Sequence, residues 1–228
     1  MRTDSSIVVK TGTGFSISDF TVSASRTVTP DTLTASLSFI ATASTLKAAQ
    51  QQLNSAFKGL VATAKKGKGY KVATGGYYAG ENYNRDETAA KTFSARQSIT
   101  LTGTDAADAI LAVVAELQEA GMALNGLNYS LSPKQAGSLN DELLTEAVGK
   151  ADATAKSLAK AVGAKSVELI QITPMLPGDG AAPKGARSFA AAASLESAGG
   201  GFDAPTAEAA EATISVSLSV IYRLVKAD

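Results

Sequence analysis

The side chains that could do chemistry in this chain are carboxylates, lysines, tyrosines and hydroxyls, because its 228 residues include neither cysteine nor histidine. This composition excludes thiol nucleophiles, disulfides, imidazole general bases and zinc sites built from thiolate or imidazole. No stretch has the full spacing of a phosphate-binding loop or of a calcium loop. We therefore expect a protein that is not an enzyme and that binds no cofactor or metal.

Two acidic pairs come closest to a catalytic pattern. Asp86 and Glu87 lie in a polar connection, and Asp105 and Asp108 lie where a helix is expected to begin. A glycosidase needs two carboxylates placed across a cleft. The simpler interpretation makes Asp105 a helix cap and leaves the first pair in a solvated loop. A carboxylate-based enzyme that acts on polysaccharide therefore remains an alternative function.

The passage GGYYAGENYNR holds three of the six tyrosines, in a chain with only 6% aromatic residues. Exposed tyrosines offer a large contact area and one hydroxyl at a low cost in conformational entropy. We predict that Tyr77, Tyr78 and Tyr83 contact a partner or a second copy of the chain. Because neighbouring strand residues point to opposite faces, one of Tyr77 and Tyr78 could instead be buried under a helix. A monomeric binding module that uses residues 75–85 is a further alternative.

A long segment at 174–212 is rich in alanine and glycine and holds four of the six prolines. Loops of this length in compact domains are usually functional or disordered. Three apolar side chains in the segment, Phe189, Leu195 and Phe202, are candidates for docking on a neighbouring subunit. They could equally fold back on their own domain.

The stretch TVTPDTLTASLSF shows how the strands begin. Pro30 fixes its own backbone and favours an extended residue before it, and Asp31 can accept hydrogen bonds in a turn. Over 32–39, hydroxyl and apolar side chains then alternate, which predicts a half-solvated antiparallel strand. We predict further strands at 20–25, 71–78, 92–102, 127–131, 166–173 and 213–224.

Three helices are predicted from apolar stripes at three- and four-residue steps. They cover 44–66, with Ser44 as N-cap, 105–120, and 139–162, and each is followed by a glycine. The order is ββαββαβαβ-loop-β. Amphipathic strands favour an α+β fold in which about three helices pack on one face of antiparallel sheet. We expect a flexible arm at 1–19 and a single domain over 20–228 that includes the long loop.

The charges balance, with 21 Lys and Arg against 21 Asp and Glu, so no long-range attraction to nucleic acid is expected. No run of about 20 apolar residues could form a transmembrane helix. The first residues, MRTDSS, have no apolar core and are not a signal peptide as they stand. We expect a periplasmic or secreted protein if an export signal has been removed, and otherwise a cytoplasmic one.

Several passages, taken in order, resemble the SIMPL domain family of mostly bacterial, often periplasmic proteins of largely unknown function. They are the Pro30-Asp31 pair with its alternating strand, TASTLKAAQQQLN, EAGMALNGLNYSLSP, LLTEAVGKADATAKSLAKAVGAK and ATISVSLSVIYRL. The resemblance covers about residues 20–225. The chain departs from the family in reading PTAEAAEA where a Gly-Glu pair usually precedes the last strand.

The resemblance implies an exported protein of the bacterial envelope. Among the members of the family, immunogenic periplasmic proteins form ring-like homo-oligomers, and others are linked to tolerance of oxidative stress. No catalytic residues are established for the family, so none are assigned here. We therefore expect a non-enzymatic envelope protein that acts through self-assembly or through binding an envelope partner.

Overall fold

The structure is a computed structural model that describes residues 8–12, 15–83, 90–175 and 205–226. Contacts between residues divide the chain into two compact units, each built on an antiparallel sheet. Unit 1 holds β1 (Val8–Gly12), β2 (Phe15–Val28), α3 (Pro133–Ala161), β7 (Ala164–Met175) and β8 (Ala212–Lys226). Unit 2 holds β3 (Thr32–Ala43), α1 (Leu46–Ala64), β4 (Lys71–Glu81), β5 (Phe93–Thr104), α2 (Ala107–Glu119) and β6 (Ala123–Ser130).

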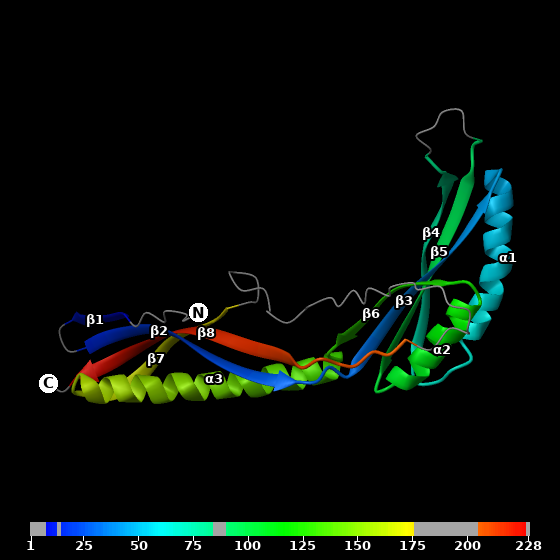
Figure 1. Cartoon of the computed structure of the whole chain (residues 1–228). Coiled ribbons are helices and arrows are strands. Elements are labelled where there is room, and N and C mark those ends of the chain that lie inside the picture. Colours follow the sequence, from blue (N-terminus) through cyan, green and yellow to red (C-terminus); the bar gives the residue numbers. More distant parts are fainter. Residues whose placement is uncertain (1–7, 13–14, 84–89, 176–204, 227–228) are drawn as a thin grey trace. The chain divides into compact units, whose positions relative to one another are not determined.

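Unit 1 is a four-stranded sheet in the order β1-β2-β8-β7, with α3 running along it (Figure 1). β2 and β8 pair over the whole length of β2, from Phe15 opposite Val225 to Val28 opposite Ala212. This register gathers the buried side chains Phe20, Leu218 and Tyr222 on the face that α3 covers. The final strand of the chain therefore lies in the centre of the sheet.

The buried stripe of α3 repeats every four residues. Four residues turn an α-helix by about 40° more than one full turn, so this stripe winds slowly around the helix and matches a twisted sheet. Most of the stripe is alanine, which lets the helix backbone approach the strands closely. The buried positions are Leu139, Leu143, Ala147, Ala151, Ala155 and Ala159.

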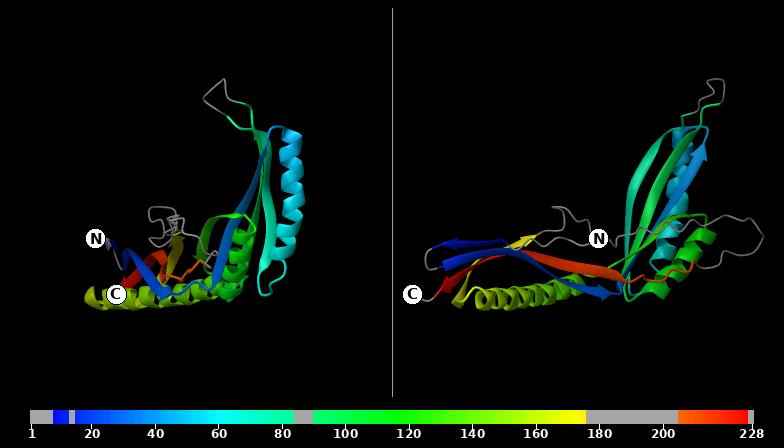
Figure 2. Two further views of the ribbon diagram at one scale, coloured as in Figure 1. Left: turned by 45° about the vertical axis from the view of Figure 1, so that its right-hand side comes forward. Right: turned by 60° about the vertical axis from the view of Figure 1, so that its left-hand side comes forward.

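Unit 2 is a second four-stranded sheet, in the order β4-β5-β3-β6. Figure 2 shows α1 running alongside these strands. Leu33 and Leu37 of β3 and Ile99 of β5 are fully or almost fully buried in one cluster with the apolar side chains of α1 and α2. The alternation of β3 thus buries its apolar side and leaves its hydroxyl side on the other face, as predicted. We call this other face, which carries neither α1 nor α2, the open face of unit 2.

The predicted α+β class, with antiparallel strands and helices on one side of the sheet, is confirmed. The region that we expected to be one domain contains the two units, because each sheet has its own helix layer and its own buried side chains. Of the arm expected at 1–19, Val8–Gly12 form β1 and residues 15–19 begin β2. No helix in the described parts of the chain has the length and apolar character needed to span a membrane.

Three predicted helix starts are wrong in detail. The N-cap of α1 is Thr45, whose hydroxyl accepts a hydrogen bond from the Ala48 N–H at 3.2 Å, and not Ser44. Asp105 does not cap α2, because its backbone lies in the left-handed region at φ +53° and Ala106 occupies the cap position. Pro133 begins α3 instead of only ending the strand before it, since proline is favoured in the first turn of a helix.

Candidate functional site

The tyrosines of the β4–β5 hairpin are exposed. The exposed fractions are 48% for Tyr77, 60% for Tyr78 and 91% for Tyr83. The alternative in which a helix buries one of the first two is therefore wrong. A contact role requires that these side chains lie at the surface, as they do. The contact itself stays a prediction.

A β-bulge in β4 decides where two of these rings lie. Gly75 is opposite Ser98 and Tyr78 is opposite Arg96, so two residues of β4 share the space opposite Gln97. One of them, Gly76, has φ +61°, a conformation that glycine adopts readily and that often accompanies a bulge. Ala79 pairs with the buried Ala95 and therefore faces the helices. Tyr77 lies two residues before Ala79 and shares its face, so Tyr77 belongs to the helix side. Tyr78 belongs to the open face.

Tyr78, Arg96 and Ile40 form a row across β4, β5 and β3 on the open face. The register places Tyr78 opposite Arg96, and Arg96 opposite Ile40, which is 52% exposed. A side-chain carbon at Gly80 would lie only 2.5 Å from the Tyr78 hydroxyl oxygen, so the Tyr78 ring lies along β4 over Gly80, toward the end of the strand. Arg96 makes no ion pair with any residue placed by the structure. The row therefore offers an aromatic surface, an apolar side chain and an unpaired cation side by side.

The other open-face positions of β3 and β5 carry hydroxyls directly opposite one another. Some of these hydroxyls bond to each other, with 2.9 Å between the Oγ1 atoms of Thr32 and Thr104. Short hydroxyl side chains can both donate and accept hydrogen bonds and lose little rotamer freedom when a ligand binds. The facing pairs are Thr32–Thr104, Thr34–Thr102, Ser36–Thr100, Ser38–Ser98 and Thr42–Ser94.

The sequence reading missed Arg96 and Ile40. Each interrupts a run of hydroxyl residues at alternate positions, Ile40 in β3 and Arg96 in β5. That interruption is the signal that could have found them. Only the pairing of the two strands shows that both interruptions fall at the same level of the sheet.

Asp31 explains the Pro-Asp pair at the start of β3. Its carboxylate accepts hydrogen bonds from the backbone N–H and the hydroxyl of Ser132, both at 2.6 Å, and from the Thr32 hydroxyl at 3.1 Å. Burial alone raises the pKa of this carboxyl, but the hydrogen bonds outweigh that effect and the net pKa lies below its ordinary value of 3.8. The contact fastens the beginning of β3 to the chain that leaves β6, so we assign Asp31 a structural role.

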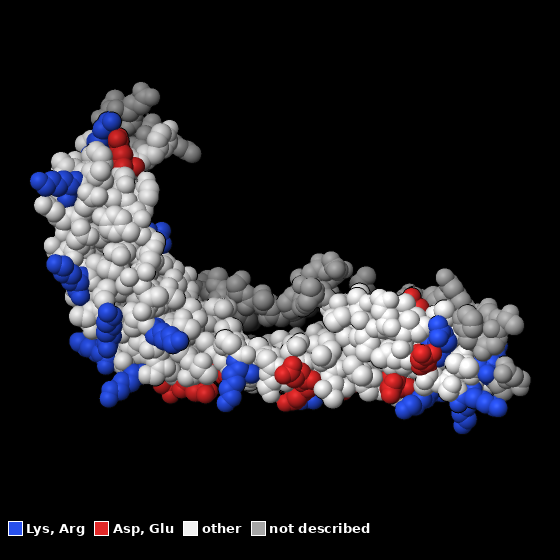
Figure 3. Space-filling model, turned by 180° about the vertical axis from the view of Figure 1, so that it is seen from behind, with Lys and Arg blue, Asp and Glu red and all other residues white. Residues whose placement is uncertain are grey.

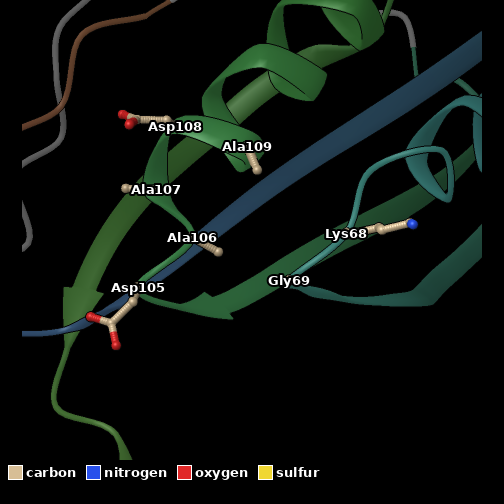
Figure 4. A pocket seen from close by; sticks show the side chains of 7 residues that line it. All are labelled: Lys68, Gly69, Asp105, Ala106, Ala107, Asp108 and Ala109. Carbon is tan, nitrogen blue, oxygen red and sulfur yellow. The ribbon is translucent and has the colours of Figure 1, made fainter.

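A cavity of about 510 Å³ lies at the start of α2, lined by Lys68, Gly69 and residues 105–109. Figure 4 shows the side chains of Asp105, Asp108 and Lys68 pointing in different directions from its wall. The two carboxylates do not face each other across a cleft. Among the residues that the structure places, no three metal-binding side chains gather. The second acidic pair, Asp86 and Glu87, lies outside the described residues.

The glycines near this cavity have a structural explanation. A side-chain carbon at Gly67 would lie 2.3 Å from the Tyr70 hydroxyl oxygen, so the tyrosine ring occupies that space. The Tyr70 hydroxyl in turn donates to the Ala64 carbonyl at 2.8 Å, near the end of α1. Gly69 has φ +88°. These residues form a helix stop and a turn.

The three apolar side chains of the long loop, Phe189, Leu195 and Phe202, lie outside the described residues. Their docking on a neighbouring subunit stays a prediction. In unit 1, the edge strand β7 exposes Leu169, Ile170 and Met175 by 44 to 46%. The sequence reading placed a strand there but did not single out these side chains.

Comparison with known proteins gives one family. The model of SIMPL, described as a protein family of unknown function (DUF541), matches residues 19–222. No curated protein matches the chain. The match spans both units and almost every described element, from within β2 to within β8. The chain belongs to the SIMPL family.

Proposed function

We propose that this protein is a non-enzymatic protein of the bacterial envelope that acts by self-assembly or by binding a partner through the β4–β5 hairpin. The observation that carries the proposal is the exposure of Tyr77, Tyr78 and Tyr83 on one hairpin. Location in the periplasm and a role in tolerance of oxidative stress are part of the same proposal, and membership of the SIMPL family supports them.

The energetics of exposed rings support a contact role. Burying one large apolar side chain is worth about 1.5–3 kcal/mol, and isolated tyrosines are common anchors in protein interfaces. Here Tyr78 and the half-exposed Ile40 lie on one face, and Tyr77 lies on the other. A partner could therefore contact both faces of the hairpin.

The non-enzymatic part of the proposal is supported by the chain's polar groups. The carboxylates that line the cavity at α2 point apart (Figure 4). Basic side chains are instead spread over the side of unit 2 where α1 runs, as the space-filling view shows (Figure 3). Residues 44–70, which include α1, hold Lys47, Lys58, Lys65, Lys66 and Lys68 and no acidic residue.

Light scattering on the purified chain over a wide range of concentrations tests the assembly form of the proposal. We expect a species larger than the 23.1 kDa chain, and a shift toward the monomer when all three tyrosines are replaced by serine. Lys58→Gln on α1 is a control that should not change the mass. A chain that stays monomeric at every concentration would remove self-assembly and leave the monomeric binding module.

A further inference from the structure

We propose that the open face of unit 2 binds a linear polysaccharide that carries carboxylates, with the sugar chain running along β5 from Lys71 past Arg96 to the ring of Tyr78. The inference deepens the partner-binding form of the proposed function by naming the chemical class of the ligand. Three features of the face carry it: its charge, its hydroxyls and the ring of Tyr78.

The charge on the open face has one sign. Lys71 lies opposite Thr102 and Arg96 lies opposite Ile40, so both cations belong to this face. Neither forms an ion pair within the part of the chain that the structure covers. The acidic residue of these strands, Glu81, lies opposite Phe93 on the helix side and pairs with Lys91 at 3.0 Å. A bound chain that carried carboxylates would complement the two cations.

The distance between the cations suits an oligosaccharide. Arg96 lies six positions along β5 from Thr102, the partner of Lys71, which is about 20 Å along a strand. Ser98 and Thr100 fill the intervening open-face positions of β5. Two cations at this separation are too few to hold a nucleic acid or an anionic bilayer by charge alone. A short chain with well-spaced acids can reach both.

The surface between the cations matches a polyol. Ser98 and Thr100 lie opposite Ser38 and Ser36 of β3, and opposite Gly75 and Ala73 of β4. Because Gly75 and Ala73 have little or no side chain, they do not block a sugar ring from approaching the hydroxyls of Ser98 and Thr100. The Ser98 hydroxyl donates to the Gly75 carbonyl at 2.6 Å and can accept from a sugar hydroxyl. The Thr100 hydroxyl can both donate and accept.

Tyr78 supplies the apolar part of the site. Sugar rings present C–H groups on their faces, and an exposed aromatic ring is the side chain best able to cover them. Tyr78 is 60% exposed, and its ring lies along β4 over Gly80, on the side of Arg96 away from Lys71, so it would cover the end of a sugar chain that passes Arg96. Next to it, the planar guanidinium of Arg96 can bind a carboxylate through two parallel hydrogen bonds.

Titration of the full chain with acidic oligosaccharides tests the inference, with octamers of galacturonic acid and of hyaluronan as probes and their methyl esters as uncharged counterparts. We expect the chain to bind an acidic octamer and to bind its ester at least about tenfold more weakly. Arg96→Gln and Tyr78→Ser should each lower the affinity about tenfold, and Lys71→Gln should lower it by a smaller factor.

Matched controls lie on the other side of the same sheet. Lys47→Gln and Lys58→Gln each remove an exposed cation from α1, on the helix side, so both should bind as the unaltered chain does. Circular dichroism establishes that each variant is folded. Failure of both acidic octamers to bind, equal binding of the esters, or an equal loss of affinity in Lys58→Gln and Arg96→Gln would overturn the inference. Because light scattering measures assembly separately, a chain that assembles but binds no sugar contradicts only the ligand.

Discussion

The carboxylate of Asp31 holds Ser132 by two hydrogen bonds of 2.6 Å, one to its backbone N–H and one to its hydroxyl. The two residues are 101 positions apart in the sequence. Each lies next to a point where the chain passes between the units, after Thr29 in one case and before Pro133 in the other. This contact therefore joins the two ends of the segment 30–132 of unit 2.

Removing the Asp31 carboxylate should destabilise unit 2. Asp31→Ala loses the acceptor for the two Ser132 donors and for Thr32, and a hydrogen bond to a charged group is worth about 1.5–3 kcal/mol. We expect the free energy of unfolding, measured in urea, to fall by about 2–3 kcal/mol. Ser132→Ala keeps the backbone donor and should cost less. Glu119→Gln, an exposed change on α2, should stay within about 0.5 kcal/mol, and an equal effect in all three would contradict the assignment.

The same contact predicts a dependence on pH. Because the folded pKa of Asp31 is lowered, the carboxylate contributes its full stability above the ordinary value of 3.8. That contribution is lost as the pH falls from there through the lowered folded pKa. The difference in unfolding free energy between the unaltered chain and Asp31→Asn should therefore shrink in acid. A difference that stays constant from neutral pH down to strong acid would show that ionisation of Asp31 does not matter.

Tyr222 is predicted to be among the last tyrosines to ionise. Its hydroxyl donates to Asp152 on α3 at 2.9 Å, and its ring stacks on Phe20 with 6.0 Å between the ring centres. Burial, and then the hydrogen bond and charge of Asp152, raise the pKa of Tyr222 to about 12. The stability that this contact adds is full below pH 10, the ordinary value, and is lost as the pH rises through the folded pKa.

Absorbance during alkaline titration checks the Tyr222 prediction. Tyr222→Phe should remove the ionisation near pH 12 and lower the unfolding free energy at neutral pH by about 1 kcal/mol, since the stacked ring remains. Asp152→Asn should bring that ionisation to lower pH, because the negative charge is gone. Loss of an ordinary tyrosine transition near pH 10 in Tyr222→Phe would be incompatible with this contact.

The alanine stripe of α3 should tolerate no enlargement. Ala151 is fully buried against the sheet of unit 1, whereas Ala153, half a turn away, is exposed. Ala151→Leu should cost about 1–3 kcal/mol through overpacking, measured by urea unfolding. Ala153→Leu adds the same side chain at the surface and should change the stability by less than about 0.5 kcal/mol. Similar costs at both positions would mean that α3 does not pack closely on its sheet.

The local features of this fold could be predicted from the sequence because they depend on nearby residues. Alternation placed Leu33 and Leu37 in the core, and apolar spacing found all three helices. The pairings between distant residues could not be predicted in this way. Nothing local indicates that β8 lies beside β2, or that Asp31 meets Ser132.

The candidate site shows the same division. The tyrosine cluster was found from composition, but the faces of its rings depend on a bulge at Gly76, which changes the alternation of β4. Arg96 and Ile40 become neighbours only through the register of β3 with β5. The pattern of each strand taken alone therefore could not predict the row of Tyr78, Arg96 and Ile40.

Sedimentation velocity of the single variants Tyr77→Ser, Tyr78→Ser and Tyr83→Ser beside the unaltered chain is the most direct test of the claim that the hairpin makes contacts. The account predicts that the unaltered chain sediments as a species larger than 23.1 kDa and that these variants shift toward that mass, whereas Tyr222→Phe does not. The contradicting result is an assembly that persists unchanged in all three hairpin variants.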